Sequence, residues 1–147
     1  MRLVVQRVTE GSVSYEDKVN SISKGYVVLL GITKGDTLDD IDYLVRKLTN
    51  LRVFDDESGK MNYSIKDING SILLVSQFTL YASVKDGNRP SFTNALNYEE
   101  SEKIYNTFIE ELSKTDINFK TGKFGADMKV SLINDGPVTI IIDSKER

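Results

Sequence analysis

The chain has 147 residues, of which 39% are hydrophobic and 28% charged, and it carries a net charge of −3 with a pI near 5.1. These values are typical of a soluble globular protein and predict a single domain over residues 1–147. No stretch approaches the ~18 apolar residues of a membrane helix, and polar residues interrupt the N-terminus too early for a signal peptide, so we expect a cytoplasmic protein without a membrane partner.

Cysteine and histidine are both missing from the chain. Their absence excludes disulfides, thiolate nucleophiles, histidine general bases and the usual zinc ligands. We therefore expect no metal and no cofactor, and any chemistry must use hydroxyls, amides, carboxylates, lysines or groups of the substrate. The acidic balance argues against an extended basic face, so DNA is not an expected partner, whereas a small local contact with RNA is compatible with it.

The first part of the chain has the pattern of strands joined by tight turns. Residues 3–8 and 12–15 favour two strands, and residues 26–32 favour a buried central strand. Arg7 falls inside the first of these. Two interpretations of this arginine stay open, a solvated edge position or a buried anchor that binds main-chain carbonyls.

A helix should follow, with Asp36 or Thr37 as its cap and a negatively charged first turn, as the helix dipole favours. Its apolar stripe recurs at the helical period and consists of Leu38, Ile41, Leu44, Val45, Leu48 and Leu51. The three aspartates of the first turn are better explained by the dipole than by a metal site. Residues 55–60 indicate an acidic surface turn, which lacks the ligand spacing of a calcium loop.

The strongest strand signal covers residues 71–82. In an extended strand, Gln77 and Thr79 would share one face about 7 Å apart, with Ser76 and Phe78 on the other. Polar residues thus interrupt a buried strand. Either a functional site or an internally satisfied hydrogen bond explains them.

In the second half, residues 83–97 show no periodicity and predict a long loop. Asn97 and Glu100 form a capping box for a second helix that ends at residues 114–116. A strand from residue 118 and a turn at 123–127 come next. Two further strands, 128–133 and 138–142, flank Gly136-Pro137, which by itself predicts a hairpin turn.

Five segments together resemble the D-aminoacyl-tRNA deacylase family, and they occur in the right order along nearly the whole chain. They are MRLVVQRV at 1–8, SQFTLYA at 76–82, GNRPSF at 87–92, FGADM at 124–128 and NDGPVT at 134–139. The resemblance implies an α+β fold with a compact antiparallel barrel-like sheet and two main helices. It also implies a homodimer with the active site at the subunit interface.

The resemblance further implies hydrolysis of the ester bond of D-aminoacyl-tRNA, which releases the D-amino acid and the tRNA. In that family the Gly-Pro bond is cis and enters the partner's pocket, which assigns chiral selectivity to Gly136 and Pro137. The catalytic positions it implies are Ser76, Gln77, Phe78 and Thr79. An acidic chain that acts on tRNA must contact its end through local cations, and the candidates are Lys85, Arg89, Lys123 and Lys129, each with an ordinary solvated surface charge as the alternative. Arg7 and Ala126 are further candidates for binding, and Phe124 and Met128 either border the terminal adenine or pack in the core.

The mechanism that the resemblance favours is assisted by the terminal ribose 2′-hydroxyl, with main-chain N–H groups near Phe78 and Thr79 stabilising the oxyanion. Thr79 as a nucleophile is the alternative, although no histidine can activate it. A site that works by rejecting L side chains should admit glycine, so glycyl-tRNA, including glycine mischarged on tRNA-Ala, is an expected second substrate.

Two rival functions stay open. One is a sister activity in which Gly136-Pro137 is trans and the pocket accepts an L-aminoacyl ester. The other is a non-catalytic dimeric module that binds an RNA end or a small ligand, which the missing conventional catalytic residues suggest.

Overall fold

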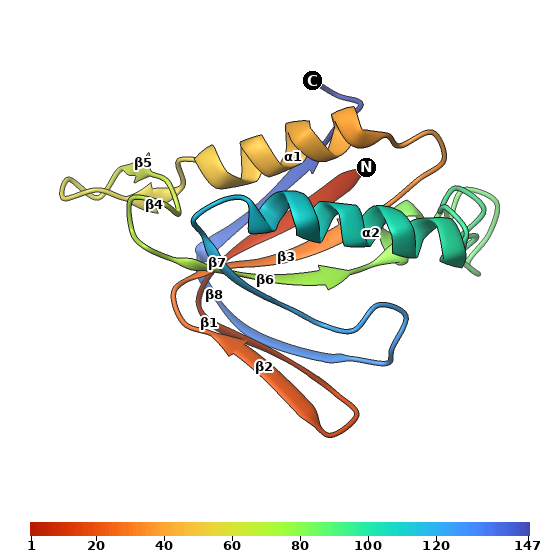
Figure 1. Ribbon diagram of the computed structural model, residues 1–147, viewed down its shortest axis with the longest axis horizontal. Helices are drawn as coiled ribbons and strands as arrows, with labels where there is room; N and C mark the ends of the chain where they lie inside the picture. The colour runs from red at the N-terminus through yellow and green to blue at the C-terminus, as the bar shows by residue number, and fades with distance from the viewer.

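The computed structural model describes all residues from Met1 to Arg147. Two α-helices lie side by side across one face of a strongly curved sheet (Figure 1). The elements in chain order are β1 (Arg2–Tyr15), β2 (Lys18–Ile22), β3 (Gly25–Gly31), α1 (Leu38–Asn50), β4 (Phe54–Asp55), β5 (Met61–Tyr63), β6 (Ser71–Ser76), the 3-10 helix η1 (Phe78–Tyr81), α2 (Tyr98–Ser113), β7 (Asn118–Thr121) and β8 (Lys129–Asp143).

The long strand β1 organises the sheet. It pairs antiparallel with β3 along its first half, with β2 along its second half, and with β8 on its other edge. β6 pairs parallel with β3, and β7 pairs parallel with β6. The expected α+β fold with two helices is confirmed, but the sheet is mixed rather than wholly antiparallel, because the connections from β3 to β6 and from β6 to β7 each contain a helix.

Side chains bring the two ends of the curved sheet together and nearly close it as a barrel. Asn20 of β2 donates to the carbonyl of Thr121 at the end of β7 (2.6 Å), and Lys120 of β7 donates to the carbonyl of Ser21 in β2 (2.8 Å). A small apolar core that includes Val13, Val27 and Val75 lies inside this barrel.

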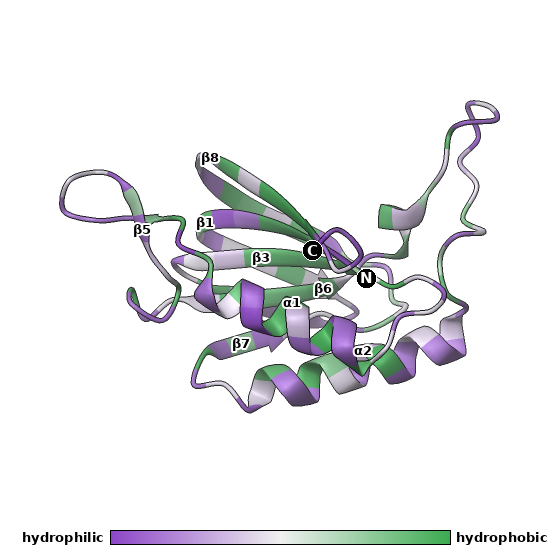
Figure 2. Cartoon of the chain, turned by 90° about the horizontal axis from the view of Figure 1, so that it is seen from above, coloured by the Kyte–Doolittle hydropathy of each residue, from purple (hydrophilic) through white to green (hydrophobic).

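The larger core lies between the sheet and the two helices. The apolar faces of both helices turn toward the strands, and their polar faces turn outward (Figure 2). The predicted stripe of α1 is confirmed at Ile41, Leu44, Val45 and Leu48, which are buried, whereas Leu38 is 53% exposed because it is the first residue of the helix. Neither helix is long and apolar enough to cross a membrane.

Ion pairs and a capping hydrogen bond hold the start of α1 in place. Thr37 is its N-cap, and the carboxylate of Asp40 accepts a hydrogen bond from the main-chain N–H of Thr37 (2.8 Å). Asp36 pairs with the buried ammonium group of Met1 (2.6 Å), and Lys145 pairs with Asp40 (2.9 Å). The aspartates of this turn thus serve as cap and ion-pair partners.

The predicted strand over residues 71–82 is wrong in its second half. β6 ends at Ser76, and the main-chain N–H of Gln77 makes the last bond to the neighbouring strand, at the carbonyl of Leu30 (2.8 Å). Since β3 ends one residue later, at Gly31, no strand is present to pair with the chain beyond Gln77. The chain therefore turns into η1.

The predicted hairpin at Gly136-Pro137 is also wrong. β8 is one strand that pairs with β1 along its length, with register shifts between Gln6 and Val8 and between Val8 and Glu10. Proline has no N–H to donate to a ladder, and a bulge removes the need for that bond without ending the strand. The dipeptide thus lies in an irregularity in the middle of β8.

Candidate active site

A pocket of about 460 Å³ opens where β6 ends. Its wall comes from the end of β6, the start of η1, the start of α2 and the turn before β8. Six of the predicted site residues line it, namely Ser76, Gln77, Phe78, Phe124, Ala126 and Met128. Segments almost fifty residues apart in the sequence thus meet at one place.

Thr79 does not line this pocket, but it contacts a residue that does. The side-chain amide of Gln77 donates a hydrogen bond to the Thr79 hydroxyl (2.5 Å). This contact exists because the chain turns at Gln77, not because the two residues share a strand face. An amide cannot take a proton from an alcohol, so this partner does not activate Thr79 as a nucleophile.

Aromatic rings form much of the pocket wall. Phe124 packs against Tyr98 (5.2 Å between ring centroids) and Tyr105 (5.3 Å), and the half-exposed Phe78 makes an edge contact with Phe92 (5.0 Å). Burial raises the pKa of Tyr105 to about 12, so this ring is neutral at physiological pH.

Sequence reasoning missed several lining residues, which are Val75, Leu96, Tyr98, Ser101, Gly125, Asp127 and Val130. Tyr98 carried a usable signal, because an aromatic residue directly after a helix cap lies at the exposed start of the helix rather than in its buried stripe.

Arg7 is buried and lies away from the pocket. Its guanidinium donates to the carbonyls of Asp135 (2.8 Å) and Val53 (2.6 Å) and contacts the carboxylate of Asp55 (3.3 Å). The solvated-edge interpretation is therefore wrong, and the buried anchor that binds carbonyls is confirmed. One of those carbonyls directly precedes Gly136.

Gly136 and Pro137 are exposed, and the peptide bond between them is cis. They do not line the pocket of their own chain. Strand β3 lies between β1 and β6 and aligns them. Through it, Val8 of β1 is aligned with Ser71 at the start of β6, and Leu3 is aligned with Ser76 at the end of β6. The dipeptide, which lies near Val8, is thus roughly 16 Å from the pocket along the strands.

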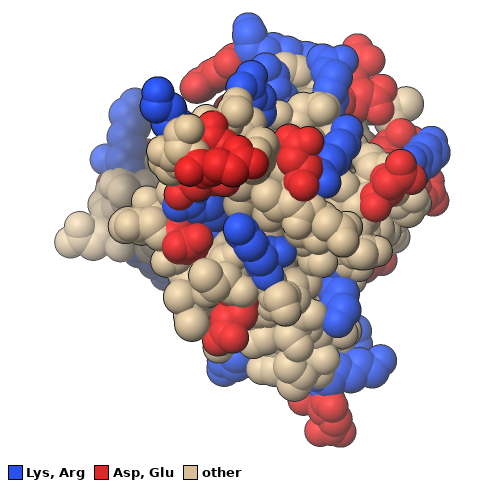
Figure 3. All heavy atoms as spheres, turned by 90° about the vertical axis from the view of Figure 1, so that its left-hand side faces the viewer, with Lys and Arg blue, Asp and Glu red and all other residues tan.

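Lys85 and Arg89 are exposed on the loop between η1 and α2, which projects at the end of the molecule opposite the β4–β5 hairpin (Figure 2). They do not line the pocket. Two other candidate cations already have acidic partners, since Lys123 pairs with Glu16 and Lys129 pairs with Asp127. On the face shown in Figure 3, acidic and basic side chains are interspersed.

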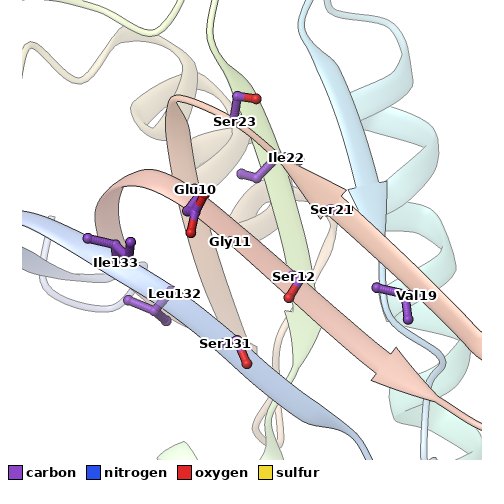
Figure 4. Close-up of a pocket in the computed structure, with 10 residues that line it drawn as sticks. All are labelled: Glu10, Gly11, Ser12, Val19, Ser21, Ile22, Ser23, Ser131, Leu132 and Ile133. Atoms are coloured by element: carbon purple, nitrogen blue, oxygen red, sulfur yellow. The ribbon is translucent and has the colours of Figure 1, made fainter.

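A second hollow of about 570 Å³ lies on the outer face of β1, β2 and β8 (Figure 4). Ser21, Ser12 and Ser131 occupy paired positions on these three strands. The lining contains no aromatic ring and no residue of the predicted site. We therefore take the smaller pocket at the end of β6 as the candidate active site.

Comparisons with known proteins agree with the motifs around this pocket. A family model described as D-Tyr-tRNA(Tyr) deacylase matches residues 4–143. The chain is 54% identical to a D-aminoacyl-tRNA deacylase of Clostridium novyi (strain NT) over 99% of both chains, and 58% identical to one of Finegoldia magna over 99% of both.

Solved structures with the same fold include the c-Myc DNA Unwinding Element Binding Protein, which is 48% identical and superposes with a TM-score of 0.90 over 97% of this chain and 98% of that one. A probable eukaryotic D-amino acid tRNA deacylase superposes with a TM-score of 0.79 over 96% and 97% of the two chains, and at 18% identity it supports the fold alone. The family match and the full-length relatives together show that the chain belongs to the D-aminoacyl-tRNA deacylase family.

Proposed function

We propose that this protein hydrolyses the ester bond between a D-amino acid and the 3′ end of tRNA, at the pocket where β6 ends. The observation that carries the proposal is the gathering of two family motifs, 76–82 and 124–128, around this pocket, where Ser76, Phe78 and Phe124 line it. Its aromatic wall suits a single-stranded RNA end, whose bases stack on such rings. A DNA duplex is not the proposed partner, because a net charge of −3 gives the protein little attraction for it.

The chemistry proposed here does not use a protein nucleophile. The Thr79 hydroxyl is bonded to an amide, and the chain has no histidine or cysteine to serve as base or nucleophile. The terminal 2′-hydroxyl of the tRNA then assists the attack of water. The main-chain N–H groups of Phe78 and Thr79, at the start of η1, are the proposed donors to the oxyanion, since the first N–H groups of a helix have no helical partner.

Selectivity for the D configuration is assigned to Gly136 and Pro137 of a second copy of the chain. The dipeptide is exposed, lies roughly 16 Å from its own pocket, and has the preceding carbonyl fixed by Arg7. A homodimer in which each copy presents this segment to the other's pocket supplies it. The main chain then occupies the space of an L side chain, and its carbonyls can accept bonds from the substrate ammonium group.

The decisive experiment compares D-tyrosyl-, L-tyrosyl- and glycyl-tRNA, the last also on tRNA-Ala, as substrates of the purified protein. Loss of the D and glycyl esters with survival of the L ester is expected. Hydrolysis of the L ester would contradict the proposed selectivity, since the sister activity on L esters was expected with a trans Gly136-Pro137 bond and this bond is cis. Binding without ester loss would indicate a non-catalytic module. Stable glycyl esters beside a cleaved D ester would disprove selection by rejection alone.

A second comparison tests the mechanism. Thr79→Ala should retain most of the hydrolysis rate, whereas a substrate that ends in 2′-deoxyadenosine should not be cleaved. The reverse pair of results would restore Thr79 as the nucleophile.

A further inference from the structure

The 3-10 helix η1 carries Phe78 and Thr79, yet none of its four residues is buried. A helix this short has few internal hydrogen bonds and is not stable alone. Contacts from neighbouring elements must therefore hold it in place beside the pocket.

Two contacts hold its ends. At the start, the main-chain N–H of Gln77 bonds to the carbonyl of Leu30 (2.8 Å). At the end, the Arg2 guanidinium donates to the carbonyl of Leu80 (3.0 Å) and lies 4.8 Å from the ring centroid of Tyr81. A guanidinium can stack on a ring and donate in its own plane at the same time, which a lysine ammonium group cannot do.

Asp143 fixes the guanidinium in turn. Its carboxylate accepts a bond from Nε of Arg2 (3.0 Å) and lies 2.9 Å from Nη2. The Asp143 side chain is only 8% exposed, so the loss of Arg2 would leave a largely buried carboxylate without its cation. Burial acts to raise the pKa of Asp143, but hydrogen bonds from the Lys145 N–H and from Arg2 outweigh it and lower the pKa, so the pair is charged at neutral pH.

We propose that Arg2, oriented by Asp143, is a positioning residue that fixes η1 and with it the reaction centre at Phe78 and Thr79. This inference rests on the proposed function for its effect on catalysis, but the fixing of η1 can be measured without any substrate.

The backbone of β3 leaves little room for η1 to lie elsewhere. A Cβ added to Gly31 would come within 2.9 Å of the Leu80 Cβ and 3.2 Å of the Tyr81 ring. The helix thus rests directly on the strand, and Arg2 holds it against that surface. The Tyr81 hydroxyl is buried without a hydrogen-bond partner, so the ring face and not the hydroxyl provides the contact.

The test combines hydrogen exchange of the whole protein with steady-state deacylation of D-tyrosyl-tRNA. Arg2→Met removes the charge and the donors, and Arg2→Lys keeps the charge but cannot bridge both partners while stacking. Tyr81→Phe keeps the ring. Arg52→Met is the matched control, because Arg52 also donates to a main-chain carbonyl, that of Asn62, far from the pocket.

In Arg2→Met we expect the amides of Leu80 and Ala82 to exchange at least about tenfold faster, while those of β3 and β6 keep their rates. The kcat should fall at least about tenfold with KM within about twofold, because a small displacement of reacting groups affects the chemical step more than binding. Arg2→Lys should fall between wild type and Arg2→Met, and the Tyr81→Phe and Arg52→Met variants should match wild type.

Unchanged exchange in η1 would overturn the inference, and so would a uniform rise over all strands, which would show a role in global stability only. Faster exchange in η1 with an unchanged kcat would overturn the positioning role. If Arg2→Met does not fold, Arg2→Lys decides by the same criteria. If the wild-type protein cleaves no D ester, the proposed function fails, while the exchange rates still decide whether Arg2 fixes η1.

Discussion

Arg7 shows what one buried charge contributes to this fold. Its guanidinium satisfies the carbonyls of Asp135 and Val53 in an environment where the arginine is only 6% exposed. Arg7→Met would leave both acceptors without their donor and should lower the free energy of unfolding by about 3 kcal/mol in urea titrations. Arg46→Met, on the exposed side of α1, should change it by less than about 0.5 kcal/mol, and equal losses would contradict the anchor.

At Gly136 both the backbone conformation and the surrounding atoms favour glycine over any residue with a side chain. Its φ is +138°, and an added Cβ would lie 2.8 Å from Cγ2 of Val138 and 3.2 Å from Nη2 of Arg7. Gly136→Ala should therefore cost about 1–3 kcal/mol of stability and displace the Arg7 anchor. In deacylation assays the ratio of D-ester to L-ester hydrolysis should fall.

Gly59→Ala separates backbone strain from crowding in that comparison. Gly59 also has a positive φ, +76°, but an added Cβ there meets nothing within 4 Å. We expect it to lose roughly 1 kcal/mol and to keep full selectivity. A Gly136→Ala variant that behaved like Gly59→Ala would show that the space around Gly136 is unimportant.

At the scale of elements, the start of α1 makes stability depend on pH through Asp40. Burial acts to raise the pKa of this carboxyl, but hydrogen bonds from Ser144, Lys145 and the Thr37 N–H lower it well below its ordinary value. Since the pKa is depressed in the folded state, the stabilisation is complete above about pH 5, begins to fall below about pH 4, and is lost only as the pH passes the folded-state pKa.

Asp40→Asn should accordingly reduce the free energy of unfolding by about 1–3 kcal/mol at neutral pH, and by less near pH 3, where part of the stabilisation has been lost. Asp39→Asn, in the same turn but exposed, is the matched control and should show neither effect. Urea titrations at the two pH values measure the difference. A deficit that does not shrink in acid would mean that the carboxylate charge is not what stabilises the turn.

Both helices were predictable from the sequence because their periodicity and caps are local signals, as Thr37 and Asn97 show. The end of β6 and the continuity of β8 were not. β6 stops where β3 stops, at Gly31, and β8 passes its proline only because β1 shifts register beside it. Such boundaries depend on a partner strand that periodicity in a single segment does not contain.

In the candidate site, too, some residues could be predicted from the sequence and others could not. Ser76, Gln77 and Phe124 could be assigned to one pocket from the motifs, and the structure brings them together. The aromatic wall at Tyr98 and the contact of Arg2 with Leu80 arise from tertiary packing of distant segments. The place of Tyr98 after the helix cap indicates that its ring is exposed, but no spacing in the sequence indicates that it meets Phe124 or that Arg2 meets Leu80.

At the scale of the whole molecule, the proposed dimer predicts that two defective variants repair each other. Gln77→Ala alters the pocket, and Gly136→Ala alters the segment that the pocket receives from the partner copy. In an equal mixture that exchanges subunits, half of the dimers are mixed and each has one site with both native parts. Sites with both native parts should then contribute D-selective hydrolysis at about a quarter of the wild-type value, which follows from the twofold symmetry of such a dimer.

Rates measured before and after subunit exchange, with dimer mass followed by light scattering, would test this. A mixture no more active than its components would mean that pocket and dipeptide act within one chain or not at all. Gln77→Ala mixed with Thr79→Ala, which both lie on the pocket side, is the control and should show no recovery beyond the average of the two.

The pairing of β1 with both β3 and β8 also determines the order in which the chain can fold. The partner of Leu3 on β3 is Leu30, whereas its partner on β8 is Ile142. During synthesis the central strand must therefore wait with one edge uncovered until the last strand has left the ribosome. Loop closure over almost the full chain length makes such a step slow, so we expect folding in milliseconds to seconds and a half-built sheet that is vulnerable to aggregation in the meantime.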